Sequence, residues 1–294
     1  MAATCEQATV EKSKERLEVL ARIEQYEREG RFSEDVENDP PGRELKPDEI
    51  DYIPKPCRFD KKIKTQMTYH LARKFMNKMI KQKQLVIKEI RGIENYRNLE
   101  SGAIITCNHF SPMDSFLAQI VYEASGQKKR RFYRVINESN YTSFPGFFGM
   151  LMRNCNTLPL SSNRQTMKKF MSAVDTLLRG GHFVLMYPEG SMWWNYRKPK
   201  PLKRGAYTLA VKSNVPVLPI FITMEDSDRL DGDGFPVQEY TIHVGKPLYP
   251  NMELGKHQRA DELLEKNYAL WKETYEKVYG IPLTYTTDPS IIKK

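Results

Sequence analysis

The chain of 294 residues has no long apolar run and only four cysteines. The longest apolar stretches, residues 144–152 and 215–222, are far shorter than the roughly 20 residues that a bilayer-spanning helix needs. Residues 1–10 have no apolar core of the kind found in a signal peptide. The cysteines, at positions 5, 57, 107 and 155, lack the spacing of a metal site or a disulfide framework, which favours a reducing compartment. We therefore expect a cytoplasmic protein that has no membrane span.

Acidic residues are outnumbered by basic ones, and the formal net charge is +9 at pH 7. Such a charge predicts attraction to anionic surfaces. Much of it lies in residues 61–84, where Met67, Leu71, Phe75 and Met79 recur at every fourth position. This pattern predicts a basic amphipathic helix in the headgroup layer of a membrane, or else an ordinary helix that packs the same stripe on the core. Nucleic-acid binding is the other class that a basic chain allows, but no RNA or DNA motif is present.

A histidine and an aspartate lie five positions apart in the sequence Asn-His-Phe-Ser-Pro-Met-Asp at 108–114. The run before it, residues 103–107, is apolar and β-branched and predicts a strand. Ser111 is a good N-cap and Pro112 suits the first helical position, so we expect a helix with Asp114 in its first turn. His109 would then lie at the carboxyl end of a strand. The pair predicts a general base with an orienting carboxylate, or else a histidine that caps a helix.

Three further motifs follow. Residues 182–187 predict a buried strand that runs into Pro-Glu-Gly-Ser at 188–191, residues 201–206 begin a predicted helix, and residues 215–222 predict another buried strand. The order Asn-His-x-x-x-x-Asp, Pro-Glu-Gly-Ser, Lys-x-Gly-Ala, Val-Pro-Val-Leu-Pro closely resembles the glycerolipid acyltransferase family, whose best-known members are the lysophosphatidic acid acyltransferases. The resemblance covers about residues 85 to 250.

The resemblance implies an O-acyltransferase. In that family the histidine deprotonates the hydroxyl of the acceptor, which attacks an acyl thioester without a covalent acyl-enzyme. Carried over by position, His109 is the base, Asp114 is its partner, and the substrate-binding residues include Asn108, Glu189, Gly190 and Ser191. The implied acceptor is a lysophospholipid similar to lysophosphatidic acid, and the donor is acyl-CoA or acyl carrier protein. No metal or tightly bound cofactor is implied, because the acyl donor is a substrate.

Two departures from the family concern the phosphate of the acceptor. The family commonly has Phe-Pro-Glu-Gly-Thr-Arg, whereas Ser191 and Met192 follow the glycine here, and a second family arginine corresponds to Arg164 only about two positions late. The basic residues that could bind the phosphate instead are Arg164, Arg197, Lys198, Lys203 and Arg204. Alternatively the acceptor is a glycolipid or polyol without a phosphate. A catalytically silent lipid-binding protein is a further alternative, against which the intact His109 and Asp114 argue.

Two adjacent tryptophans, Trp193 and Trp194, follow the Pro-Glu-Gly-Ser motif. They could cover the pocket, line the acyl path or anchor the loop at the headgroup boundary, and core packing of one with exposure of the other is equally compatible with the pattern.

The predicted fold class is α/β, with a mixed sheet of about seven strands flanked by helices and preceded by N-terminal helical segments, similar to that of glycerol-3-phosphate acyltransferase. We divide the chain into an N-terminal helix with a proline-rich connector (1–60), the basic membrane-interface helix (61–84), the acyltransferase domain (85–250) and a C-terminal helix with a tail (251–294). With no spanning helix, an enzyme that acts on lipid would be peripheral on the inner face of the membrane.

Overall fold

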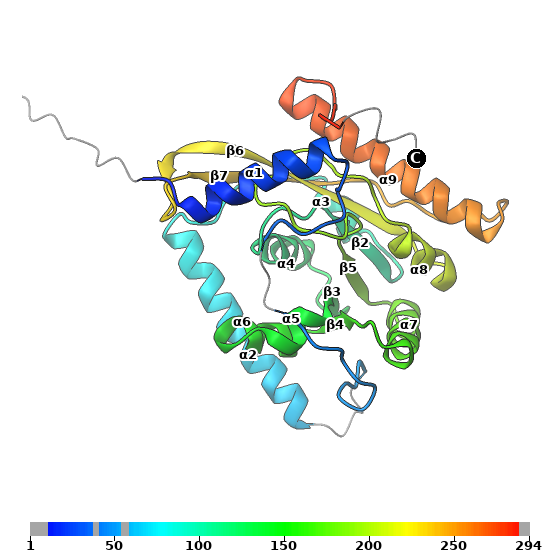
Figure 1. Ribbon diagram of the computed structural model, residues 1–294. Coiled ribbons are helices and arrows are strands. Elements are labelled where there is room, and N and C mark those ends of the chain that lie inside the picture. Colours follow the sequence, from blue (N-terminus) through cyan, green and yellow to red (C-terminus); the bar gives the residue numbers. More distant parts are fainter. Residues whose placement is uncertain (1–10, 38–40, 54–58, 288–294) are drawn as a thin grey trace, which may run out of the picture.

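A seven-stranded mixed sheet forms the centre of the computed structural model, which describes residues 11–37, 41–53 and 59–287 (Figure 1). The strands are β1 (Val86–Arg91), β2 (Ala103–Cys107), β3 (Phe132–Asn137), β4 (Thr157–Leu160), β5 (Phe183–Met186), β6 (Val217–Leu230) and β7 (Pro236–Val244). Their order is β1-β7-β6-β2-β5-β3-β4, and the five strands from β6 to β4 run parallel. Because β6 and β7 are antiparallel, β7 and its parallel neighbour β1 run the other way. The predicted fold class is confirmed.

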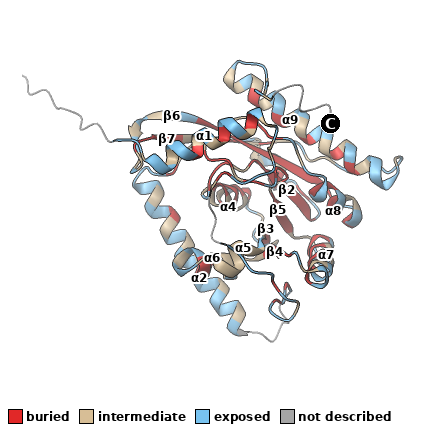
Figure 2. Ribbon diagram, in the orientation of Figure 1, coloured by how far each residue is buried: buried red, intermediate tan, exposed pale blue. Residues whose placement is uncertain are grey.

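Helices cover both faces of the sheet, and its central strands are buried between them (Figure 2). On one face, α7 (Arg164–Arg179), α8 (Gly205–Ser213) and α9 (Lys256–Tyr279) pack on Ile104 and Val184. On the other face, α3 (Ile93–Arg97), α4 (Asp114–Ser125) and part of α2 (Phe59–Lys81) pack on Ile105 and Leu185. Successive strand residues thus point to opposite layers, as the two-residue repeat requires, and a strand covered on both faces must be continuously apolar.

The helix after β2 begins two residues later than the sequence predicts. Pro112 and Met113 form a turn, in which the Ser111 hydroxyl accepts a hydrogen bond from the Met113 amide at 3.1 Å, and α4 begins at Asp114. The expectation that Ser111 caps the helix itself is therefore wrong, because its hydroxyl is used by this turn. Asp114 still lies in the first helical turn, as predicted.

Residues 138–154 form two short helices, α5 (Glu138–Ser143) and α6 (Gly146–Asn154), between β3 and β4. The apolar segment 144–152 is mostly α6. It lies against α2, where Phe147 and Phe148 meet Phe75 with ring centroids 5.3 and 5.9 Å apart.

The N-terminal segments pack on the domain. Val19 and Ile23 of α1 (Lys14–Arg28) form a small core with Trp193 and Trp194, which are 0% and 8% exposed. Both tryptophans are therefore buried, and the expectations that one is exposed or that they anchor the loop at the headgroup boundary are wrong. Leu45 and Tyr52 of the proline-rich connector join the core under α7. The parts of the connector at 38–40 and 54–58 lie outside the described residues.

Candidate active site

His109 lies in the turn that joins β2 to α4, next to the buried carboxylate of Asp114. The distance from His109 Nδ1 to Asp114 Oδ2 is 2.6 Å. A carboxylate at this distance assigns the proton of the neutral imidazole to Nδ1 and leaves Nε2 as the acceptor. Within the described residues Nε2 has no hydrogen-bond partner, and the His109 side chain is 26% exposed whereas that of Asp114 is 1% exposed. The pair therefore has the geometry of a general base with its orienting acid.

Four donors surround the Asp114 carboxylate. Besides the imidazole, Oδ2 accepts from the amides of Phe110 at 3.1 Å and Ser111 at 3.3 Å, and Oδ1 accepts from the Tyr187 hydroxyl at 2.7 Å. A buried carboxylate is costly unless it is hydrogen-bonded in this way, and its place in the first turn of α4 adds the favourable helix dipole.

Tyr187 belongs to this group although sequence reasoning did not assign it. Its ring stacks on the imidazole of His109 with centroids 4.0 Å apart and an interplanar angle of 17°. Burial, together with the charge of Asp114, raises the pKa of Tyr187 well above its usual value, so the phenol stays protonated and donates to Asp114. One signal was available, because Tyr187 is the last residue of the predicted strand and directly precedes the Pro-Glu-Gly-Ser motif.

Glu189 supports the backbone of the histidine. Its Oε2 accepts from the His109 amide at 3.0 Å and its Oε1 accepts from the Lys200 amide at 2.9 Å, and the residue is buried. The Lys200 ammonium lies 3.9 Å from Oε2 and donates to the carbonyl and the hydroxyl of Ser191, each at 2.8 Å. Burial raises the pKa of Glu189, which the charge of Lys200 opposes, and burial lowers the pKa of Lys200 to about 8. Sequence reasoning missed Lys200, for which the sequence carries no signal beyond its place in a basic stretch.

The other predicted substrate-binding residues near this turn make contacts within the protein. The side chain of Asn108 accepts from the amide of Ile222 and donates to its carbonyl, so it fastens the turn to β6. Gly190 has φ +75°, where only glycine is relaxed, and a Cβ there would collide with the ammonium of Lys203. The Ser191 hydroxyl donates to the Phe32 carbonyl at 2.7 Å.

Most of the candidate basic residues are engaged elsewhere. Arg204 donates to Asp261 and to the His257 carbonyl on α9, Arg197 pairs with Asp226, and Lys198 pairs with Glu27. Lys203 is exposed, lies over Gly190 and makes no ion pair with the described residues. Arg164 begins α7 and makes no hydrogen bond or ion pair with the other candidates in the described part of the chain.

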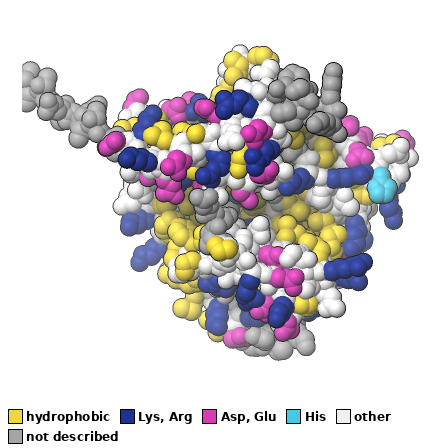
Figure 3. All heavy atoms as spheres, viewed as in Figure 1, with side chains coloured by type: hydrophobic (Ala, Val, Ile, Leu, Met, Phe, Trp, Pro, Cys, Tyr) yellow, Lys and Arg dark blue, Asp and Glu magenta, His cyan; other side chains and the backbone are white. Residues whose placement is uncertain are grey.

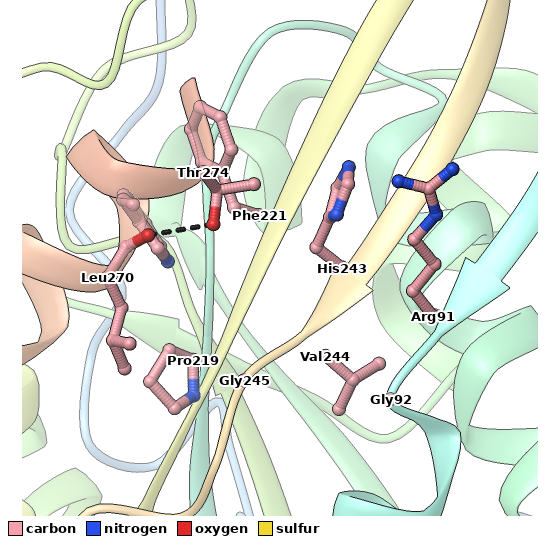
Figure 4. Close-up of a pocket in the computed structure, with 10 residues that line it drawn as sticks. Arg91, Gly92, Pro219, Phe221, His243, Val244, Gly245, Leu270 and Thr274 are labelled. Carbon is pink, nitrogen blue, oxygen red and sulfur yellow. Dashed lines mark hydrogen bonds between the residues drawn. The ribbon is translucent and has the colours of Figure 1, made fainter. Parts of the chain in front are cut away.

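Two cavities lie outside this group of residues. One, of about 200 Å³, lies between α9 and the sheet, and Figure 4 shows His243 and Arg91 next to each other on neighbouring strands along it. Burial lowers the pKa of His243 to about 4. The other, of about 640 Å³, follows α7. Neither cavity is lined by His109 or Asp114.

The family model described as Acyltransferase matches residues 88–223. The protein named 1-acyl-sn-glycerol-3-phosphate acyltransferase BAT2, chloroplastic, of Brassica napus is 29% identical over 137 residues, which are 45% of this chain and 36% of that protein. The crystal structure of the 1-acyl-sn-glycerophosphate (LPA) acyltransferase PlsC from Thermotoga maritima matches 77% of this chain and 91% of that chain, with 19% identity and a TM-score of 0.49.

The matched region is thus an acyltransferase domain, and it contains β2, α4, the His109 turn and the Pro-Glu-Gly-Ser turn. The match to the Acyltransferase model and the similarity to the Brassica napus protein confirm the resemblance to the glycerolipid acyltransferase family that the sequence motifs carry. The chain spans little more than a third of the length of the Brassica napus protein.

Proposed function

We propose that this protein transfers a fatty acyl group from an acyl thioester to the hydroxyl of a lysophospholipid, with His109 as the general base. The observation that carries the proposal is the hydrogen bonding of the imidazole of His109, which is partly exposed. Its Nδ1 is bonded to Asp114 at 2.6 Å, whereas its Nε2 has no hydrogen-bond partner among the described residues. The acyltransferase domain that contains this pair supports the reaction class.

In the proposed reaction, Nε2 takes the proton of the acceptor hydroxyl as the oxygen attacks the thioester carbonyl. The tetrahedral intermediate then collapses, the carbon–sulfur bond breaks, and the leaving thiolate takes the proton back from the imidazolium. Asp114 stays ionised throughout, fixes the tautomer and stabilises the imidazolium. Tyr187 and the two backbone amides hold Asp114, and Glu189 holds the main chain of His109.

The acceptor is proposed to be similar to lysophosphatidic acid, because the Brassica napus protein carries the name of a 1-acyl-sn-glycerol-3-phosphate acyltransferase. Lys203 supports this assignment, since its unpaired ammonium lies over Gly190 beside the Glu189 that braces His109. One observation favours the second candidate, a glycolipid or polyol acceptor: Met192 stands where the family has an arginine, and the nearby Arg197, Lys198 and Arg204 are already bonded to carboxylates.

Activity measurements decide between these acceptors. Purified protein is incubated with a labelled acyl thioester and a panel of lysolipids with and without a phosphate. Turnover confined to phosphorylated acceptors supports the first candidate, and turnover of the others supports the second. His109→Ala is expected to abolish turnover while attachment to liposomes is unchanged. Retained turnover in this variant would exclude His109 as the base.

A lipid acceptor requires contact with a membrane, and we propose that α2 provides it. No helix in the described part of the chain is both long enough and apolar enough to cross a bilayer. Met76 of α2 is buried, but Ile63 and Met67 are 54% and 62% exposed, and Leu71 is also exposed. Figure 3 shows apolar side chains near α2 and α6 with lysines and arginines around them. This arrangement suits a helix that rests in the headgroup layer, held by about 1 kcal/mol for each basic residue near an anionic leaflet.

The apolar surface of α2 leads toward the catalytic pair. Phe75 of α2 meets Phe116 of α4 with ring centroids 5.8 Å apart, and Phe116 follows Asp114 by two residues. An acyl chain that leaves the bilayer along α2 would therefore arrive at the first turn of α4.

Vesicle sedimentation tests this surface. We expect Met67→Ser to weaken binding to vesicles of mixed neutral and anionic lipid, because it removes an apolar side chain that would otherwise be buried in lipid. Met252→Ser is the matched control, since Met252 is 60% exposed but lies in the loop that leads into α9, away from α2 (Figure 1). Equal loss of binding in both variants, or no loss in the first, would exclude α2 as the membrane contact.

A further inference from the structure

A groove of about 640 Å³ lies along α7, separate from the turns that hold His109 and Glu189. One side is the residues that follow β4, the floor is a single stripe of α7, and Lys212 of α8 closes the far end. The lining residues are Ser161, Ser162, Arg164, Met167, Lys168, Met171, Ser172, Asp175 and Lys212.

The groove combines positive charge with an apolar floor. Arg164, Lys168 and Lys212 are exposed, and none of them pairs with a carboxylate among the described residues. The one acidic residue of the lining, Asp175, is already engaged, because it accepts from Arg179 at 3.0 Å and from the Ser213 hydroxyl at 2.7 Å. Met167 and Met171 are half-buried between these charges. Cations around a polarisable apolar floor suit a ligand with phosphates and an aromatic ring.

The end of the groove at Ser161 lies level with His109 across the sheet. One row of paired residues crosses the four strands β2, β5, β3 and β4: Ile105, Leu185, Arg134 and Thr157. His109 lies four residues after Ile105, and Ser161 lies four residues after Thr157. Since β2 and β4 are three strand spacings apart, the two positions are separated by roughly 14 Å.

We propose that this groove binds the 3′-phosphorylated ADP portion of a coenzyme A thioester, which is the acyl donor of the proposed function on which this inference rests. The pantetheine arm has about twelve backbone bonds, the length of four extended residues, and so reaches about 14 Å. That reach matches the separation between the groove and His109. When the nucleotide of coenzyme A lies in the groove, its thioester sulfur can therefore reach the turn that holds His109.

The shape of the groove favours coenzyme A over an acyl carrier protein as its occupant. Its volume lies within the range of pockets that enclose a small molecule. A carrier protein would instead dock on a broader surface, since stable protein interfaces bury on the order of 800 Å² on each partner. Arg164, which the sequence assigned to the phosphate of the acceptor, is thereby assigned to a phosphate of the donor.

Calorimetric titration with free coenzyme A tests the site without relying on turnover. The double variant Lys168→Glu, Lys212→Glu is expected to raise the Kd for coenzyme A about tenfold or more, because two attractive charges become repulsive. The Kd for dephospho-coenzyme A, which lacks the 3′-phosphate, should rise less. Lys128→Glu is the matched control, since Lys128 is exposed in the loop after α4 and does not line the groove. A thermal melt checks that each variant is folded.

Steady-state kinetics then separate failure of the site from failure of the function. With acyl-CoA the double variant should raise KM about tenfold, whereas with an acyl thioester of pantetheine, which has no nucleotide, variant and wild type should agree. If the variant turns over acyl-CoA with an unchanged KM and binds coenzyme A with an unchanged Kd, the groove is not the coenzyme A site, although the proposed function stands. Turnover by the wild type with acyl carrier protein alone would likewise exclude the groove as a coenzyme A site. If no thioester is turned over, the proposed function fails, and the Kd values still decide whether the groove binds coenzyme A.

Discussion

Substitution of Asp114 by asparagine removes the negative charge beside His109 while it preserves the shape of the site. The amide oxygen can take the place of Oδ2, where it still accepts from the imidazole and from the amides of Phe110 and Ser111. The NH₂ group then takes the place of Oδ1 and can donate to the oxygen of Tyr187, whose hydroxyl is free to rotate. The turn should therefore keep its geometry.

The expected loss of activity follows from the missing charge. An imidazolium and a carboxylate whose charge centres are about 4 Å apart attract each other by about 4 kcal/mol at an effective dielectric constant of about 20. This attraction exists only once His109 has taken the proton, so it lowers the barrier without strengthening the binding of substrate. Its loss corresponds to a fall of about 10³-fold in kcat. Because charge-assisted hydrogen bonds become neutral ones, the free energy of unfolding should fall by about 1–3 kcal/mol.

The assay is single-turnover and steady-state acyl transfer by Asp114→Asn, together with urea denaturation. Asp226→Asn is the matched control, because Asp226 also accepts from two side chains, Arg197 and Gln238, but makes no hydrogen bond or ion pair with His109 or Asp114 in the described part of the chain. The control should keep its kcat. If Asp114→Asn is folded and keeps kcat within about threefold of the wild type, electrostatic stabilisation of an imidazolium at His109 is refuted.

Three further predictions concern the residues that hold the site and the sheet. Tyr187→Phe keeps the ring stacked on the imidazole but leaves Asp114 Oδ1 without its donor, so urea denaturation should show a loss of about 1.5–3 kcal/mol, and an unchanged midpoint would contradict the bond. Lys200→Met leaves the buried Glu189 carboxylate without its cation and should lower the free energy of unfolding by about 3–5 kcal/mol. Adding Glu189→Gln to this variant should restore part of the loss, and losses that simply add in the double variant would count against the pairing. Burial lowers the pKa of His243 to about 4, so the unfolded chain binds the proton first as the pH falls below about 6.5. Stability should therefore fall between pH 6.5 and 4 by at most about 3 kcal/mol, and His243→Gln should lose less over the same window in a series of denaturation curves.

The sequence was sufficient to predict that His109 and Asp114 lie together, because the pair is local. His109 lies near the start of the turn after β2 and Asp114 begins α4, so the geometry of one strand-to-helix connection brings them within 2.6 Å. The buried strands could be predicted for a similar reason, since a strand covered on both faces is continuously apolar. Helix boundaries do not follow from the pattern in the same way. The start of α4 at Asp114 was mispredicted because a side chain such as that of Ser111 can bond within a turn as well as cap a helix.

The residues that support the pair depend on the order of the strands, which apolar patterns do not encode. Tyr187 and Glu189 reach Asp114 and His109 only because β5 pairs with β2, although about eighty residues separate these strands in the chain. Lys200 is buried because it lies under Trp193, which α1 covers.

The roles of the basic residues were decided by the tertiary structure as well. In the sequence Arg197, Lys198 and Arg204 are equivalent candidates for a phosphate, yet each meets a carboxylate from a distant helix or strand, whereas Lys203 and the groove along α7 keep unpaired charge. A short motif thus determined the position of the proposed general base, because neighbouring residues share one backbone turn. The surroundings of that base depended on contacts between distant segments, which form only when the hydrophobic layers pack against the sheet.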